Sequence, residues 1–330
     1  MNRLVRAVTA GSAAAALALA AGCGGGTVAD PGSEGTAENS GGSGSISVAT
    51  AKGDVELDKP ATKVVSLEWS YTEELLALGV TPAGAADTGT YGDWVTAPDA
   101  QLPDDVTDVG SRQEPSIEKI KALDPDLIVS DVDRLTANYD QLKEIAPVAA
   151  FDPTKQPQLE TMKTNFTELA EAVGKEDKAE EVLGELDAKV EDVKSTIEES
   201  GESDSPFALA QGYTAEGAPG IRMFTSDTMA ASLLEEAGLK NGWSGKPDSW
   251  GMTTVGVEGL TKVDSDARFL YVALKSDDPF TSVLKGNAAW QNLPFVKQDK
   301  VAALDPGTWL FGGPLSAMQL LDETAKAYSA

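Results

Sequence analysis

Arginine side chains are the first candidates for binding chemistry in this sequence. A guanidinium group presents a planar fork of hydrogen-bond donors that matches the oxygens of a carboxylate or a hydroxamate. Beyond the first 22 residues, the arginines are Arg112, Arg134, Arg222 and Arg268. Arg268 adjoins an apolar run and is expected to belong to the scaffold. The others fall in loops or at strand ends, so we predict that Arg112, Arg134 and Arg222 bind an anionic ligand. An ion pair with a surface carboxylate is the alternative for each.

Aromatic side chains in polar or glycine-rich segments are the second set of candidates. A ring in such a segment favours a ligand wall over the apolar core, although ordinary packing is the alternative. We therefore predict that these rings line the same site as the arginines. They are Tyr91, Trp94, Tyr213, Trp250 and Trp309.

The composition excludes several classes of function. The 330-residue chain has 53 acidic and 26 basic residues, a formal net charge of -27, and no histidine. A surface this acidic repels nucleic acids and anionic lipids, which we exclude as partners. Without histidine, the chain lacks the usual general base of catalysis and the commonest zinc or copper ligand. Cys23 is the sole cysteine, so a disulfide framework and a thiolate metal cluster are also excluded.

Residues 1–22 are typical of an export signal, because Arg3 and Arg6 precede a short apolar run that ends in small residues. The small residues before Cys23 resemble a bacterial lipoprotein signal, and this resemblance implies that Cys23 is the site of lipid attachment. Plain secretion is the alternative. Residues 23–44 are rich in Gly, Ser, Thr and Glu and are expected to form a flexible tether. We therefore expect a lipid-anchored protein on the outer face of the cytoplasmic membrane.

Three larger segments must position the candidate side chains. Residues 176–199 predict one long helix, because their apolar positions recur every three or four residues and share one face. At about 1.5 Å per residue, this helix would be roughly 36 Å long. Strand and helix patterns alternate on both sides of it, so the predicted fold is α/β, with two Rossmann-like lobes joined by a single long backbone helix. The expected segments are an N-terminal lobe over 45–158, linking helices over 159–200 and a C-terminal lobe over 201–330. An ordinary surface helix of one large domain is the alternative.

Within the N-terminal lobe, the sequence predicts a buried strand over 63–67 and a helix over 71–78. Residues 87–108 are expected to form a loop that carries two of the aromatic candidates. Arg112 lies in the next loop, and we expect that loop at the edge of the sheet where α/β proteins bind ligands.

Four stretches of the sequence resemble one protein family. Three lie within residues 64–148: VVSLEWSYTEELLALGVTPAGAAD, VGSRQEPSIEKIKALDPDLIVSD and EIAPV. The fourth, VAALDPGTWLFGGPLSAMQLLDE, lies near the C-terminus. They are similar to the periplasmic-type binding proteins that serve ABC importers of ferric siderophores. The ferric-citrate-binding members look most similar, because they also pair a tryptophan before the central block with an arginine inside it.

The resemblance implies a transport receptor and not an enzyme. It implies that the protein captures a ferric siderophore of the citrate, carboxylate or hydroxamate type between its two lobes and delivers it to an ABC permease. It also implies that Glu118 and Glu258, one on each lobe, dock onto arginines of the permease; a solvated surface charge is the alternative for both. We expect a monomer without a cofactor and without direct metal ligands, because the chelator already fills the coordination sphere of the iron.

Two other functions stay open at this point. A receptor of the same fold for cobalamin or haem is the first, although the absence of histidine disfavours axial ligation of either ligand. An exported hydrolase that uses a pair of carboxylates, such as a glycosidase, is the second. With 53 acidic residues, suitable carboxylate pairs arise by chance, so only a measured turnover would favour the hydrolase.

Overall fold

The computed structural model describes residues 45–329 of the chain. The predictions for Cys23, for the export signal over 1–22 and for the tether over 23–44 therefore lie outside the described residues. These described residues belong to one compact unit. Within its described part, no helix is both long enough and apolar enough to cross a membrane.

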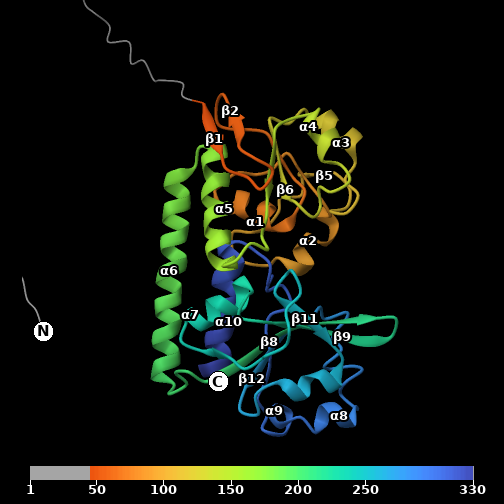
Figure 1. The fold of residues 1–330 in the computed structure, drawn as a ribbon, viewed down its shortest axis with the longest axis vertical. Coiled ribbons are helices and arrows are strands. Elements are labelled where there is room, and N and C mark those ends of the chain that lie inside the picture. Colours follow the sequence, from red (N-terminus) through yellow and green to blue (C-terminus); the bar gives the residue numbers. More distant parts are fainter. Residues whose placement is uncertain (1–44, 330) are drawn as a thin grey trace, which may run out of the picture. The chain divides into compact units, whose positions relative to one another are not determined.

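The N-terminal lobe lies at the top of Figure 1. It is built on five parallel strands in the order β5-β4-β3-β6-β7. Every residue of β3, β6 and β7 is buried, as is typical of a parallel sheet covered on both faces. A hairpin of two antiparallel strands, β1 and β2, precedes the sheet. The strands are β1 (Ile46–Val48), β2 (Val55–Leu57), β3 (Val64–Ser66), β4 (Gly84–Ala85), β5 (Thr107–Asp108), β6 (Leu127–Asp131) and β7 (Val148–Phe151).

The helices of this lobe differ from the prediction at two places. Helix α1 (Trp69–Ala77) begins earlier than expected, because the Glu68 side chain accepts a hydrogen bond from the Trp69 backbone N–H at 2.8 Å. Helix α2 (Thr88–Trp94) forms inside the stretch that was expected to be a loop, so that expectation is wrong in part. The remaining helices are α3 (Ile117–Leu123) and α4 (Tyr139–Lys143).

Two helices connect the lobes. Helix α5 (Gln158–Val173) ends at Gly174, whose backbone adopts a left-handed conformation with φ of 63°. Helix α6 (Glu176–Glu199) confirms the long helix predicted from the sequence. The apolar residues of this face are Leu183, which is half-buried, and five buried residues, Val182, Leu186, Val190, Val193 and Ile197. This stripe packs α6 against α5 and against the C-terminal helix α10 (Pro314–Ser329).

The C-terminal lobe has a mixed sheet in the order β11-β9-β8-β12-β13, with β10 also paired to β8. Strands β8 and β9 form an antiparallel hairpin, whereas β12 is parallel to both β8 and β13. The strands are β8 (Pro206–Ala215), β9 (Ala218–Phe224), β10 (Lys240–Asn241), β11 (Met252–Val255), β12 (Arg268–Val272) and β13 (Val301–Ala303). The helices before α10 are α7 (Met229–Glu236), the 3₁₀ helix η1 (Val257–Lys262), α8 (Ala288–Gln291) and α9 (Pro294–Lys297).

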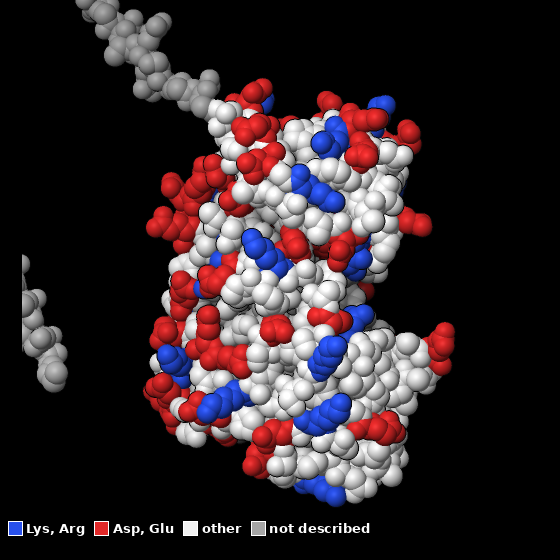
Figure 2. Space-filling model, in the orientation of Figure 1, with Lys and Arg blue, Asp and Glu red and all other residues white. Residues whose placement is uncertain are grey.

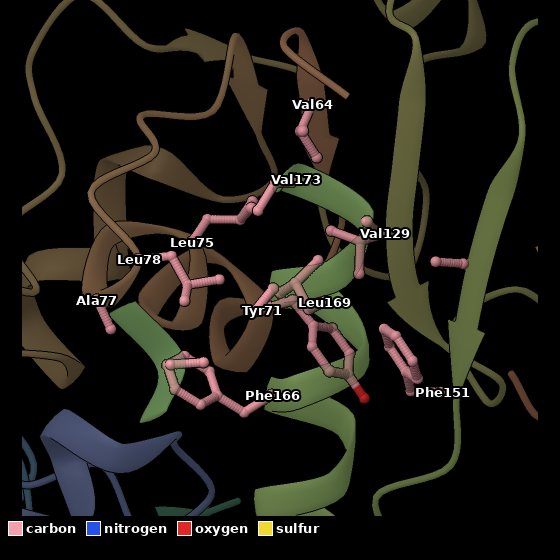
Figure 3. Packing of buried hydrophobic residues seen from close by; sticks show 14 of the residues in the cluster. Val64, Tyr71, Leu75, Ala77, Leu78, Val129, Phe151, Phe166, Leu169 and Val173 are labelled. Carbon is pink, nitrogen blue, oxygen red and sulfur yellow. The ribbon is translucent and has the colours of Figure 1, made fainter. Parts of the chain in front are cut away.

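The apolar core of the N-terminal lobe fixes the position of α1. Leu75 of α1 and Leu78, which caps the end of this helix, belong to the same buried cluster as Phe166 and Leu169 of α5 (Figure 3). Tyr71 packs beside Phe151 of β7, with ring centres 5.3 Å apart. A buried apolar side chain of this size contributes about 1.5–3 kcal/mol to folding. These contacts therefore hold α1 firmly in place, together with the polar residues at positions 68 to 74.

Candidate ligand-binding site

A cavity of about 630 Å³ is lined by residues of both lobes and of α5. Figure 2 shows basic and acidic side chains together at the indentation on the right-hand side of this face. The cavity brings together six of the eight predicted ligand-binding residues. They are Arg112, Arg134, Tyr213, Arg222, Trp250 and Trp309.

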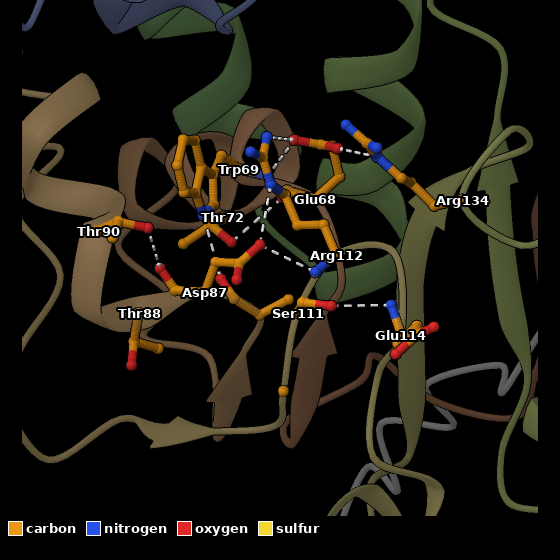
Figure 4. Close-up of polar contacts among 12 residues, drawn as sticks. Glu68, Trp69, Thr72, Asp87, Thr88, Thr90, Ser111, Arg112, Glu114 and Arg134 are labelled. Carbon is orange, nitrogen blue, oxygen red and sulfur yellow. Dashed lines mark hydrogen bonds and ion pairs between the residues drawn. The ribbon is translucent and has the colours of Figure 1, made fainter. Parts of the chain in front are cut away.

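Glu68 holds two of these arginines on the N-terminal wall (Figure 4). One oxygen of its carboxylate accepts a hydrogen bond from Arg112 Nη1 at 2.9 Å, and the other accepts from Arg134 Nε at 2.7 Å. Arg112 Nε also donates to Asp87 at 3.3 Å. Burial is the largest single influence and would lower the pKa of Arg134, but the charge and hydrogen bond of Glu68, together with the charges of Asp131 and Asp133, raise that pKa overall. Both guanidinium groups are therefore fixed in place before a ligand arrives.

Trp69 orients the Arg112 guanidinium. The guanidinium carbon lies 3.6 Å from the centre of the Trp69 ring, the arrangement of a cation–π contact. The ring itself is fixed, since its Nε1 donates to the Ala86 carbonyl at 3.1 Å. Arg112 Nη2 forms no hydrogen bond within residues 45–329, so this group can donate to a ligand oxygen.

Arg222 comes from the opposite lobe. It lies on β9, directly across from Gln211 on β8, and its Nη1 donates to Gln211 Oε1 at 2.9 Å. Its guanidinium also lies 4.9 Å from the centre of the Tyr213 ring. No carboxylate of the described chain lies within ion-pair distance of Arg222. Its positive charge is therefore uncompensated, unlike the charges of Arg112 and Arg134.

A row of aromatic rings crosses from one lobe to the other. Trp309 has its ring centre 5.4 Å from that of Trp69 and 5.1 Å from that of Phe311. Phe311 in turn lies 6.5 Å from Trp250. The Nε1 group of Trp309 is buried and has no hydrogen-bond partner among the described residues. This row offers an apolar wall to a ligand.

Two predicted aromatic residues do not line the cavity. Tyr91 is buried in the core, where its hydroxyl donates to the Ala100 carbonyl at 3.0 Å. Trp94 packs against Trp309, with ring centres 5.8 Å apart. Both lie on α2, the helix that replaces part of the expected loop, and this helix directs them behind Trp69 and Trp309 instead of toward a ligand.

Glu73 on α1 is buried because it binds the start of α10. Its carboxylate accepts hydrogen bonds from the Ser316 backbone N–H at 2.7 Å and from the Ser316 hydroxyl at 2.6 Å. Burial raises the pKa of Glu73 to about 7, against the opposing effect of these hydrogen bonds. This carboxyl links α1 to α10 and does not belong to the cavity wall.

The sequence reasoning missed Glu68, Tyr71, Glu74 and Asp131, all of which line the cavity. Burial raises the pKa of Glu74, and the neighbouring charge of Glu73 adds to this effect. Burial, followed by the charge of Glu68, raises the pKa of Asp131 to about 6. The sequence did indicate that Glu74 is buried. In a helix it shares one face with Tyr71, three residues before it, and Leu78, four residues after it.

The two predicted docking residues lie away from the cavity. Glu118 is exposed on the first turn of α3, and Glu258 is exposed on η1 of the other lobe. Neither forms an ion pair within the part of the chain that the structure describes. Over the same residues, no group of three or more Asp, Glu or Cys side chains is placed to hold a metal ion.

Two α/β lobes with a charged and aromatic cavity between them define a solute receptor, a class that captures a small molecule between its lobes. The sequence model of the family described as "Periplasmic binding protein" matches residues 64–308. The chain belongs to this family.

Similar proteins support the assignment. The chain is 31% identical over 265 residues to the iron(3+)-hydroxamate-binding protein FhuD of Escherichia coli, covering 78% of this chain and 84% of that protein. It is 30% identical over 247 residues to the Fe(3+)-citrate-binding protein YfmC of Bacillus subtilis, covering 75% of this chain and 74% of that protein. The crystal structure of FhuD from Vibrio cholerae bound to Fe3+-Desferal matches with a TM-score of 0.73 and 26% identity, covering 82% of this chain and 98% of that one. Both the expected family and the two-lobe fold are thereby confirmed.

Proposed function

We propose that the protein is an extracytoplasmic receptor that captures a ferric siderophore between its two lobes and delivers it to an ABC permease. The observation that carries the proposal is the cavity, to which one lobe contributes Arg112 and Arg134 and the other contributes Arg222 and three rings of the aromatic row, Trp309, Phe311 and Trp250. The relatives support it, since those named above bind ferric hydroxamate or ferric citrate.

The cavity suits an iron complex that is already fully chelated. The guanidinium groups donate to chelator oxygens, and such bonds are worth about 1.5–3 kcal/mol each when one partner is charged. The rings of Trp309, Phe311 and Trp250 cover the apolar arms of the chelator. The protein supplies no ligand to the iron and performs no reaction on the complex. Residues 45–158, 159–200 and 201–330 act as the first lobe, the linking helices and the second lobe.

The location of the protein follows from the same function. We propose that Cys23 carries a lipid that keeps the receptor at the outer face of the cytoplasmic membrane, with residues 23–44 as the tether. Two relatives from Bacillus subtilis are named substrate-binding or siderophore-binding lipoproteins. The receptor acts as a monomer and presents Glu118 and Glu258 to the permease. Ion pairs at these exposed positions contribute orientation more than affinity.

A tryptophan-fluorescence titration tests the binding step. The purified protein is titrated with ferric citrate, a ferric hydroxamate, a ferric catecholate, haem and cyanocobalamin, and with each chelator free of iron. The proposal predicts saturable quenching by at least one ferric chelate and a much weaker response to its iron-free form. Quenching by haem or cobalamin alone would assign the cavity to a different ligand of the same fold, and no response to any of them would remove the proposed function.

A further inference from the structure

Three buried side chains on the N-terminal wall of the cavity have polar atoms without a partner. Tyr71 Oη, Glu74 Oε2 and Asp131 Oδ2 accept or donate no hydrogen bond within residues 45–329. The three residues are 2%, 2% and 1% exposed, respectively, and all of them line the cavity. Because buried polar atoms are seldom left unpaired in folded proteins, these atoms indicate a group that the ligand supplies.

The three side chains lie on neighbouring elements. Tyr71 and Glu74 are three residues apart on α1, so they share one face of that helix. Asp131 ends β6, the strand paired with β3, and α1 begins just after β3. The hydroxyl of Tyr71 lies at the edge of the apolar side chains labelled in Figure 3. After burial, the charges of Glu74 and Asp131 are the largest influences that raise the pKa of Tyr71, as expected if the three groups are close together.

The charges of the cavity wall do not favour an anion beside Tyr71, Glu74 and Asp131. Acidic side chains outnumber basic ones, since Arg112, Arg134 and Arg222 face Glu68, Glu74, Asp131, Asp133 and Asp248. Glu68 already pairs with both arginines of the N-terminal wall. Asp131 lies 3.9 Å from Arg134, and Glu74 forms no ion pair within residues 45–329. The wall around Glu74 therefore offers hydrogen-bond acceptors, and the ligand group that matches them is a positively charged hydrogen-bond donor.

The chemistry of that donor follows from the acceptors. A metal ion would need a tighter cage, and no group of three or more acidic or thiol side chains in the described chain forms one. A protonated primary amine carries three hydrogen-bond donors on one nitrogen. We propose that Tyr71, Glu74 and Asp131 form a subsite for such an ammonium group, and that the preferred ligand is a ferric hydroxamate with a protonated amine rather than an anionic ferric citrate. This inference rests on the proposed function and names the chemical class of its ligand.

The subsite divides the cavity into two parts. The ammonium arm of the chelate meets the acceptors on α1 and at the end of β6. The iron-bearing part faces Arg222 and the row formed by Trp309, Phe311 and Trp250. An ammonium group beside Glu74 would favour its ionised form, which burial disfavours while the site is empty.

A matched pair of ligands tests the subsite. Desferrioxamine B is a linear trihydroxamate with one terminal primary amine, and its N-acetyl derivative lacks only the charge of that amine. The affinity of the protein for the two ferric complexes, and for ferric citrate, is measured by calorimetry at pH 7. We expect acetylation to weaken binding at least about tenfold, which corresponds to about 1.4 kcal/mol, and ferric citrate to bind more weakly than the amine-bearing complex.

Variants of the subsite show whether these residues carry the preference. In Glu74→Gln, and separately in Asp131→Asn, the difference between the amine-bearing and the acetylated complex is expected to fall to about threefold or less. Two substitutions are used so that the failure of one to fold does not decide the result. Glu185→Gln removes the same charge from an exposed position on α6 and is expected to keep the full difference.

The outcomes separate this inference from the function on which it rests. If the wild-type protein binds the amine-bearing and the acetylated complexes equally, or binds ferric citrate as tightly as the amine-bearing complex, the ammonium subsite is overturned and the siderophore receptor stands. The subsite is also overturned if both variants fold and keep the wild-type preference. If no ferric chelate binds, the proposed function itself is contradicted.

Discussion

The guanidinium of Arg112 lies 3.6 Å from the centre of the Trp69 ring. Trp69 is the first residue of α1, and the residue before it, Glu68, both caps this helix and accepts a hydrogen bond from Arg112 at 2.9 Å. The start of a single helix therefore fixes the plane and the position of the arginine. A side chain held this way loses little conformational freedom when a ligand binds, which favours affinity.

We expect Arg112→Ala to weaken the binding of the ferric chelate at least about tenfold, a loss of about 1.4 kcal/mol. The substitution removes the free Nη2 donor and leaves Glu68 with one partner fewer, so the melting temperature is expected to fall as well. Affinity is measured by calorimetry well below the melting temperature of the variant. Lys285→Ala, which removes a positive charge from an exposed loop of the C-terminal lobe, serves as the control. Unchanged affinity in folded Arg112→Ala would exclude this arginine from the site.

We expect Glu118→Ala combined with Glu258→Ala to abolish iron uptake by cells while leaving chelate affinity unchanged. The two carboxylates are exposed, one on each lobe, and do not line the cavity. If they dock onto the permease as proposed, their loss is expected to affect that contact and not the binding of the chelate. Uptake of radioactive iron is compared with binding by the purified variant. The paired control is Glu185→Ala with Glu199→Ala, both exposed on α6. Uptake at the wild-type rate in the Glu118 and Glu258 variant would contradict their role in docking.

We expect the buried carboxyl of Glu73 to make the folded protein less stable as the pH rises. Its pKa is about 7 in the folded protein against 4.5 for the free group, so the folded state binds the proton more tightly. The resulting stability is complete below pH 4.5 and is lost as the pH rises to about 7. The difference between the two pKa values corresponds to about 3 kcal/mol in free energy of unfolding.

Glu73→Gln tests this dependence, because glutamine keeps a hydrogen bond to Ser316 without carrying a charge. Relative to the wild type, the variant is expected to gain about 2–3 kcal/mol in free energy of unfolding between pH 5 and pH 8. Urea denaturation at several pH values measures this free energy, with Glu185→Gln as the exposed control. A constant difference between variant and wild type across this range would contradict the buried, proton-binding state of Glu73.

The elements that the sequence predicted well are those whose signal is local. The apolar stripe of 176–199 is a property of one helix, and the structure places that helix at Glu176–Glu199. Arg112 and Trp309 were found because their chemistry is unusual for a loop, and both line the cavity. Tyr91 was misplaced because the burial of α2 depends on contacts with Trp69 and Ala100, which the local sequence does not reveal.

The acidic side of the cavity was missed for a different reason. In a chain with 53 acidic residues, Glu73 and Glu74 look like ordinary charges on a helix surface. Their burial arises from long-range packing: Gly313 lies so close to Glu74 that an added Cβ would be 2.6 Å from the Glu74 side chain, and Ser316 binds Glu73. Only the folded structure shows that the Glu73 carboxyl has a hydrogen-bond partner, whereas the Glu74 carboxyl has none within residues 45–329.

The position of the bound iron tests the central claim most directly. Crystals of the protein grown with a ferric hydroxamate are measured at X-ray energies above and below the iron absorption edge, and the anomalous difference locates the iron without reference to the chelator. We expect a single iron peak inside the cavity, between Arg112 on one lobe and Arg222 and Trp309 on the other, with no protein atom coordinated to it. An iron peak outside the cavity, or one bound directly by protein carboxylates, would contradict the account.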